Sequence, residues 1–232
     1  MKLYQIGPMF ENETLEALKK YSGRFIMLKY FSIGFGIAGV ILGLFACAPK
    51  PKVEDSCNFV QNVYGQRISW KDQVPIPLFI HADFPKQFIP ALEKAMKVWE
   101  TSAGHKLFTI INNNYRDNST PEKDGKSVVY WLKAWEAEKP SEQARTSIYW
   151  VGDQIREADL RVNAKNFSYY LDTPQSDKQV HLESLLIHEL GHVLGLKHND
   201  AGESVMATYL ALDFKRDVLS KDDQKAMVCE YK

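Results

Sequence analysis

The sequence has few cysteines and no excess of charge of either sign. Only three cysteines occur among 232 residues, and none form a Cys-x-x-Cys pair, so a cysteine-based zinc site is not expected. Lysine plus arginine equals aspartate plus glutamate, at 29 each, and this balance does not indicate nucleic acid as a partner. Internal repeats and low-complexity tracts are also missing. With 45% hydrophobic and 25% charged residues, the composition predicts one ordinary globular domain plus an export segment.

Three of the six histidines fall in one short segment, His188-Glu-Leu-Gly-His192-Val-Leu-Gly-Leu-Lys-His198. On a helix, His188 and His192 lie on the same face one turn apart, so both imidazoles can reach one metal ion. Glu189 is offset by about 100° and lies beside the metal, where it can hold and deprotonate a water molecule. Gly195 can end the helix in the left-handed conformation, and His198 can then return as a third ligand.

Three neutral imidazoles with one open position are typical of a catalytic zinc site rather than a closed structural one. A polar helix end with incidental histidines is the alternative. The full motif HExxHxxGxxH, followed by Ser204-Val205-Met206, resembles the metzincin metalloproteases. Met206 lies eight residues after His198, the spacing of the matrixins. The resemblance implies that Met206 forms a turn that places an apolar floor under the ligands; an ordinary core methionine is the other interpretation.

The expected fold is α+β. The resemblance implies a metzincin fold, with a twisted, mostly parallel sheet, one antiparallel edge strand, an active-site helix and a C-terminal helix. Apolar periodicity predicts strands at 76–82, 106–111, 127–132, 146–151 and 157–163, a short strand at 167–171, and helices at 88–102 and 182–196. Residues 112–125 read as a loop, and 134–145 as either a short helix or a loop. Ser220 with Asp223 predicts the cap of a last helix that runs to about residue 229 and resembles the final matrixin helix.

The segment 157–163 alternates charged and apolar residues and resembles the matrixin edge strand beside the active-site cleft. We therefore assign Ala158 and Leu160 to substrate binding, through a peptide that adds to this strand. A plain solvated edge strand is the alternative. Ala207-Thr208-Tyr209 replaces the Pro-x-Tyr segment that walls the matrixin specificity pocket, and Asn199 replaces the serine after the third histidine. Tyr209 is a candidate for substrate binding or for oxyanion stabilisation, with a wall or core role as the alternative.

The N-terminal part of the chain is typical of an exported protein. Residues 27–46 read as a signal peptide of lipoprotein type, and Leu44-Phe-Ala-Cys47 resembles a bacterial lipobox with Cys47 as the lipidation site, although Phe45 departs from its pattern. Residues 1–26 then form an extension before a start at Met27, and 47–56 form a tether. A longer, uncleaved membrane anchor is the alternative. Residues 57–232 are expected to form the matrixin-like domain.

If Cys47 is lipidated, Cys57 has one partner left, Cys229, and an exported location permits a disulfide between them. The alternative is that Cys57 ligates the zinc and blocks it, as the propeptide cysteine of matrixins does, although the sequence around that cysteine is absent here. No histidine lies between His105 and His181, where matrixins hold a second, structural zinc, so we expect one zinc ion. Calcium at Asp153, Glu157 or Asp172 is only weakly indicated.

The predicted function is zinc-dependent endopeptidase activity, with Glu189 as general base and zinc bound by His188, His192 and His198. The expected partner is a peptide or protein substrate, and the expected location is the cell envelope, with a lipid anchor in the outer membrane of a bacterium and a monomeric chain. One alternative is a non-catalytic surface lipoprotein that uses its zinc site to bind a protein or cell-wall partner. Another is a narrow processing protease with one or a few substrates.

Overall fold

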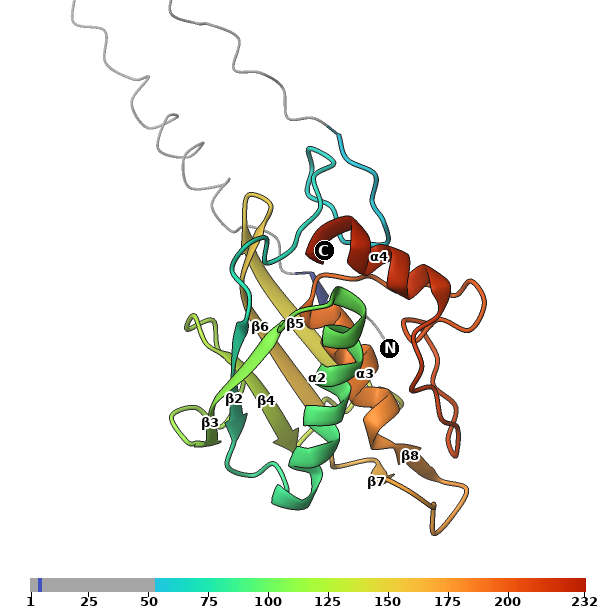
Figure 1. Cartoon of the computed structure of the whole chain (residues 1–232). Coiled ribbons are helices and arrows are strands. Elements are labelled where there is room, and N and C mark those ends of the chain that lie inside the picture. The colour runs from blue at the N-terminus through green and yellow to red at the C-terminus, as the bar shows by residue number, and fades with distance from the viewer. Residues whose placement is uncertain (1–3, 6–52) are drawn as a thin grey trace, which may run out of the picture.

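The structure is a computed structural model that describes residues 4–5 and 53–232. Within these residues a six-stranded sheet and three α-helices carry most of the chain (Figure 1). The elements in chain order are β1 (Tyr4–Gln5), β2 (Ile76–His81), the 3₁₀ turn η1 (Lys86–Phe88), α2 (Ile89–Ala103), β3 (Phe108–Tyr115), β4 (Ser127–Leu132), β5 (Ala144–Val151), β6 (Gln154–Asn163), β7 (Ser168–Tyr170), β8 (Gln179–His181), α3 (Leu182–Val193) and α4 (Lys221–Tyr231). None of the helices in this part of the chain is long and apolar enough to cross a bilayer.

The sheet is mostly parallel, as the fold expectation states. Its strand order is β1-β5-β6-β4-β2-β3, and only β5 and β6 run antiparallel to each other. The two residues of β1 pair in parallel with Ser147 and Ile148 on the outer side of β5. Strands β7 and β8 form a separate parallel pair that leads directly into α3. The architecture is therefore the α+β arrangement expected of a metzincin.

The expectation that 157–163 is the edge strand is wrong. Strand β6 lies inside the sheet, paired with β4 on one side and with β5 on the other. The charges that suggested a solvated edge are buried, with Glu157 2% and Asp159 1% exposed. Their carboxylates accept backbone N–H groups of Gly125 and Val128 instead of facing water. The strand that runs antiparallel to β6 is β5, and β1 pairs with the other side of β5.

Helices α2 and α3 lie side by side against one face of the sheet (Figure 1). Eleven of the twelve residues of α3 are buried, because α3 lies between α2 and the strands β5 and β6. Trp99 of α2 is fully buried, and its indole N–H donates to the backbone carbonyl of Ile187 on α3, at 2.9 Å. This contact fixes α3, which carries the first two histidines of the motif, against its neighbour.

Helix α3 ends three residues earlier than the sequence pattern suggests, because the chain turns at Gly195. Val193 is its last residue, and Gly195 adopts φ +102°. Its free C-terminal carbonyls are satisfied from distant segments: Trp70 donates to Val193, and the Tyr231 hydroxyl donates to Leu194. Elsewhere, β3 continues to Tyr115 into the expected loop, and 134–143 contains turns rather than a helix.

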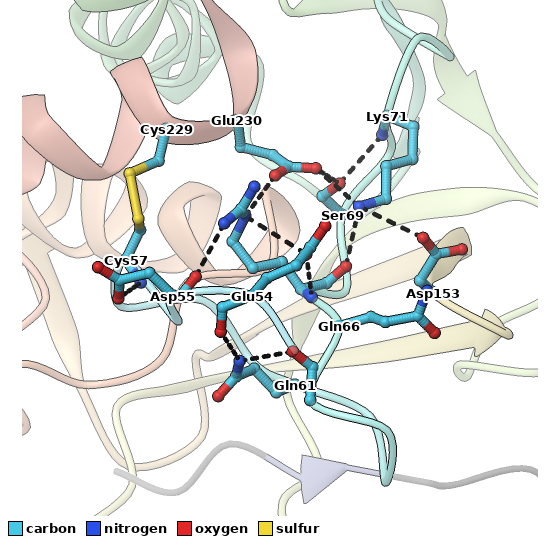
Figure 2. A network of polar contacts seen from close by, with 12 residues as sticks. Glu54, Asp55, Cys57, Gln61, Gln66, Ser69, Lys71, Asp153, Cys229 and Glu230 are labelled. Atoms are coloured by element: carbon cyan, nitrogen blue, oxygen red, sulfur yellow. Dashed lines mark hydrogen bonds and ion pairs between the residues drawn. A yellow bond between two sulfur atoms is a disulfide. The ribbon is translucent and has the colours of Figure 1, made fainter. Parts of the chain in front are cut away.

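The segment 53–71 is fastened to α4 by a disulfide and a polar cluster (Figure 2). Cys57 is bonded to Cys229. The adjacent Glu230 accepts hydrogen bonds from Arg67 Nε at 2.6 Å, from Lys71 Nζ at 2.9 Å and from the Ser69 hydroxyl. These ion pairs, together with the Ser69 hydrogen bond, lower the pKa of Glu230 against the effect of burial.

The last residues of the expected tether contact the segment that follows them. Glu54 accepts the Arg67 backbone N–H at 2.8 Å, and the Asp55 carbonyl accepts from the Arg67 guanidinium. The other expectations for the N-terminal part fall almost wholly outside the described residues. They are the 1–26 extension, of which only Tyr4 and Gln5 are described, the signal peptide at 27–46, Cys47 and the first part of the tether.

Candidate metal centre

The three histidines of the motif converge on one point. His188 and His192 come from successive turns of α3, and His198 returns after the turn at Gly195. One ring nitrogen from each lies within 4.8 Å of the others, and among residues 4–5 and 53–232 this is the one group of three or more potential ligands so close together. The Nε2 atoms of His192 and His198 are 3.1 Å apart. Two nitrogens on a tetrahedral zinc at 2.0–2.1 Å are about 3.3 Å apart, so the spacing fits that ion.

The opposite ring nitrogens of the two helical histidines are held by backbone carbonyls. Nδ1 of His188 lies 2.7 Å from the Val205 carbonyl oxygen, and Nδ1 of His192 lies 2.7 Å from the Leu196 carbonyl oxygen. A carbonyl can only accept, so each Nδ1 carries the proton and each Nε2 keeps a free lone pair. Nε2 of His188 is buried without a hydrogen-bond partner. A buried, unsatisfied nitrogen beside two others is what a metal ion satisfies.

Burial also keeps these rings neutral. It lowers the pKa of His188 well below its ordinary value and that of His192 to about 3, and each neighbouring imidazole adds to the effect. Burial lowers the pKa of the more exposed His198 as well. Neutral imidazoles are the form that binds metal, so the trio is ready to act as a ligand set at neutral pH.

Glu189, which follows His188 in α3, is fully buried. Its Oε2 accepts a hydrogen bond from the Thr146 hydroxyl of β5, at 2.7 Å, while its Oε1 has no partner in the part of the chain that the structure describes. Burial raises the pKa of this carboxyl to about 8, and the Thr146 hydrogen bond opposes the rise. A divalent cation bound nearby would, like the Thr146 hydrogen bond, lower the pKa of this carboxyl. The chain therefore holds one oxygen of Glu189 in place and leaves the other free.

Met206 packs against α3 at Gly191. It is fully buried, and a Cβ added at Gly191 would lie 2.2 Å from its sulfur. The Met206 carbonyl accepts the backbone N–H of Asn199, the residue after the third histidine. Glycine at position 191 thus lets the methionine approach the helix between the two helical histidines.

A family model for matrixins matches residues 99–232, more than half of the chain. The chain belongs to the matrixin family. No curated protein matches the chain closely enough to count as a relative. The matched region contains α3, the three histidines and Met206, so the ion that fits the trio in this matrixin is zinc.

The strand that borders the metal centre of this matrixin is β5 rather than β6. Thr146 of β5 contacts Glu189, whereas both sides of β6 are already paired. Ala158 and Leu160 are 1% and 0% exposed. A peptide cannot add to β6 at these two residues, because no free backbone edge exists there; their assignment to substrate binding is therefore corrected. On the side of β5 away from β6, only the two residues of β1 pair with the strand, at Ser147 and Ile148.

Tyr209 lies on the surface, with 71% of its area exposed. Its backbone carbonyl accepts a hydrogen bond from Arg216, while the next residue, Leu210, is buried and accepts through its carbonyl from Gln143. The core role considered for Tyr209 is thus contradicted. Substrate binding, stabilisation of the oxyanion and a role in the pocket wall stay predictions for this exposed ring.

The other sequence candidates for metal binding do not join the trio. Cys57 is bonded to Cys229, so its sulfur is not available to block the zinc in the way considered above. Asp153 forms an ion pair with Lys71 at 3.5 Å. Glu157 is buried against the backbone of Gly125.

Two residues near the site were not identified from the sequence. Thr146 contacts Glu189, and Asp223 of α4 accepts the Ser204 hydroxyl at 2.5 Å and the Val205 backbone N–H at 3.0 Å. Asp223 therefore holds the turn whose Val205 carbonyl orients His188. The sequence offered a signal for Asp223 only as part of a helix cap, and none for Thr146, since threonine is ordinary in a strand.

Proposed function

We propose that this matrixin is a zinc-dependent endopeptidase in which Glu189 is the general base. The observation that carries the proposal is the position of the free Glu189 Oε1. It belongs to a fully buried carboxylate on the residue that follows the ligand His188, and it has no hydrogen-bond partner among the described residues. A module that only binds zinc has no use for such a carboxylate.

Different residues of the site have different roles in peptide hydrolysis. His188, His192 and His198 would hold the zinc. When bound, zinc acts as a Lewis acid that polarises the scissile carbonyl and lowers the pKa of water from 15.7 to about 7. Glu189 takes the proton of the attacking water at Oε1 and then gives it to the leaving amine nitrogen. The surrounding buried side chains keep bulk water away from the carboxylate, which strengthens its interactions.

The substrate peptide is proposed to add to the outer edge of β5. Because β1 pairs with Ser147 and Ile148 on this edge, the peptide would take the place of β1; the β1 pairing supports the proposal as an example of a short segment that pairs there. Backbone hydrogen bonds of such a strand give affinity regardless of sequence, and side-chain contacts give preference. The exposed ring of Tyr209 is proposed to supply one of these contacts.

A peptide-library digest tests the proposal, with the intact protein compared with Glu189→Ala and Glu189→Gln. Wild-type protein with one zinc per chain should cleave internal peptide bonds, and a chelator should stop cleavage. Both variants should keep zinc, because Glu189 is not a ligand, and should lose activity by about 10²-fold or more. Full activity in either variant, or no cleavage of peptides and proteins by zinc-loaded wild-type protein, would overturn the proposal.

We also propose that the protein is exported and anchored through a lipid on Cys47, in the outer membrane of a bacterium, as a monomer. The Cys57–Cys229 disulfide supports export, because disulfides persist in oxidising compartments. Metabolic labelling with a radioactive fatty acid should label wild-type protein and not Cys47→Ala. Equal labelling of both would contradict the lipid anchor.

A further inference from the structure

Thr146 lies where strand β5 meets the active-site helix α3. It is 1% exposed, and its hydroxyl oxygen is 2.7 Å from Oε2 of Glu189 and 3.3 Å from the backbone carbonyl oxygen of the same residue. A hydroxyl has one hydrogen to donate, and a charged acceptor at the shorter distance takes it. The side chain of Thr146 is therefore a donor to one specific carboxylate oxygen.

The two oxygens of Glu189 are not equivalent as a result. Oε2 has the Thr146 hydroxyl as its partner, and Oε1 has none. A glutamate side chain has a broad final torsion, so its carboxylate is free to rotate unless a partner holds it. In this site the hydrogen bond from β5 selects the rotation in which Oε1 is the free oxygen.

We propose that Thr146 is a positioning residue for the general base: its hydroxyl holds Oε2 of Glu189 so that Oε1 is the oxygen that accepts the proton. This inference rests on the proposed endopeptidase function and adds a residue to it. Thr146 does not touch zinc or substrate. It acts only through the carboxylate.

The place of Thr146 in the sheet gives this contact a further consequence. Its neighbour Ser147 is the residue at which β1 adds to β5. A peptide strand on the same edge would lie beside the residue that holds Glu189.

The test compares Thr146→Val, which keeps the shape and loses the donor, with Thr146→Ser, which keeps the donor. The control is Thr101→Val, which removes a threonine hydroxyl bonded to the Lys97 carbonyl on α2. Thr146→Val should lower kcat by about 10- to 100-fold with KM and zinc content unchanged, since it removes one hydrogen bond to a charged group. Thr146→Ser should return kcat to within about threefold of wild type, and Thr101→Val should match wild type.

A crystal structure of zinc-loaded Thr146→Val provides a readout that does not depend on activity. The Glu189 carboxylate should be rotated or present in two orientations, whereas it should be single in wild type. An unchanged carboxylate, an unchanged kcat, loss of zinc, or a Thr146→Ser variant as slow as Thr146→Val would each overturn the inference. If wild-type protein cleaves no peptide, the proposed function fails, and the crystal structure still decides whether Thr146 positions Glu189.

Discussion

Gly195 makes the turn that brings His198 back to the other two histidines. Two features of this position exclude a side chain. Its φ of +102° is one that residues with a Cβ rarely adopt, and an added Cβ would lie 2.3 Å from the backbone carbonyl oxygen of Ile68. A backbone atom cannot move aside as the end of a flexible side chain can. Glycine is thus required at position 195 both by the backbone conformation of the turn and by the close contact with the Ile68 backbone.

Gly195→Ala should therefore lower the free energy of unfolding more than the same substitution at a glycine with free space around it. We expect a loss of about 3 kcal/mol in the free energy of unfolding, together with lower zinc occupancy, because the turn must shift to relieve the overlap. Gly104→Ala is the matched control: its φ is +81°, and nothing lies within 4 Å of the added Cβ. That variant should lose only about 1 kcal/mol and keep its zinc. Urea unfolding and metal analysis measure both; equal losses would contradict this account.

Asp159 makes the stability of the domain depend on pH. Burial raises its pKa to about 8 from an ordinary value of 3.8, and the nearby carboxylates of Glu157 and Asp124 add to the rise. The unfolded chain releases this proton near pH 4, whereas the folded chain keeps it to near pH 8. The folded state binds more protons across that window, so stability falls as pH rises through it.

Asp159→Asn should remove this contribution. The variant should lose less stability than wild type between pH 5 and pH 8, because asparagine does not titrate and its oxygen can still accept the Val128 N–H. Urea unfolding of both proteins at three pH values across the window measures the difference. Parallel stability curves for the two would contradict the assignment.

At the scale of elements, the sequence predicts those features that depend on residues close together in the chain. The active-site helix, its ligand face and the Ser220 cap follow from spacing within one turn, and the structure has the capping box between Ser220 and Asp223. The placement of β6 fails because alternation alone does not say whether a charge meets water or backbone donors of a neighbouring strand. The Thr146–Glu189 contact joins residues 43 positions apart, and no local pattern encodes it.

Asp223 links the last helix to the metal centre. It caps α4 through Ser220, and it also binds Ser204 and Val205, whose carbonyl holds the His188 ring. The residue is 1% exposed, so its hydrogen bonds lie out of water. Helix α4 therefore supports the first zinc ligand through one carboxylate.

Asp223→Asn should lower the free energy of unfolding by about 2 kcal/mol and weaken zinc binding, because an amide cannot accept at both oxygens. Asp222→Asn is the control, since Asp222 is exposed and forms an ion pair with Lys225. The Asp222→Asn substitution should change the free energy of unfolding by less than about 0.5 kcal/mol. Competition with a zinc chelator and thermal unfolding compare the two. Similar zinc affinities in both variants would count against the role of Asp223.

At the scale of the molecule, the two ends of the domain support each other and the metal centre. The disulfide spans 172 positions between Cys57 and Cys229. Asn58, next to Cys57, accepts the backbone N–H of Lys197 at its carbonyl and donates from its side chain to the Lys197 carbonyl. Lys197 precedes the third ligand, His198. The segment around Asn58 thus holds the turn that leads to His198 through these two hydrogen bonds.

The double variant Cys57→Ser, Cys229→Ser should lose about 2–5 kcal/mol of stability, since the disulfide closes a long loop in the unfolded chain. It should also bind zinc more weakly than wild type, because the segment around Asn58 is less firmly held. Unfolding by urea and chelator competition measure the two effects. The polar cluster around Glu230 should keep the fold native, which circular dichroism checks. Unchanged stability in the double variant would contradict the role of the disulfide.

The most direct test of the whole account is the zinc content of the purified protein. The account predicts one zinc ion per chain for wild type, and far less than one for His188→Ala and His192→Ala, since each removes a ligand from the group of three. Elemental analysis after removal of loosely bound metal gives the number. A wild-type protein that takes up no zinc, or histidine variants that bind as much as wild type, would contradict the account at its centre.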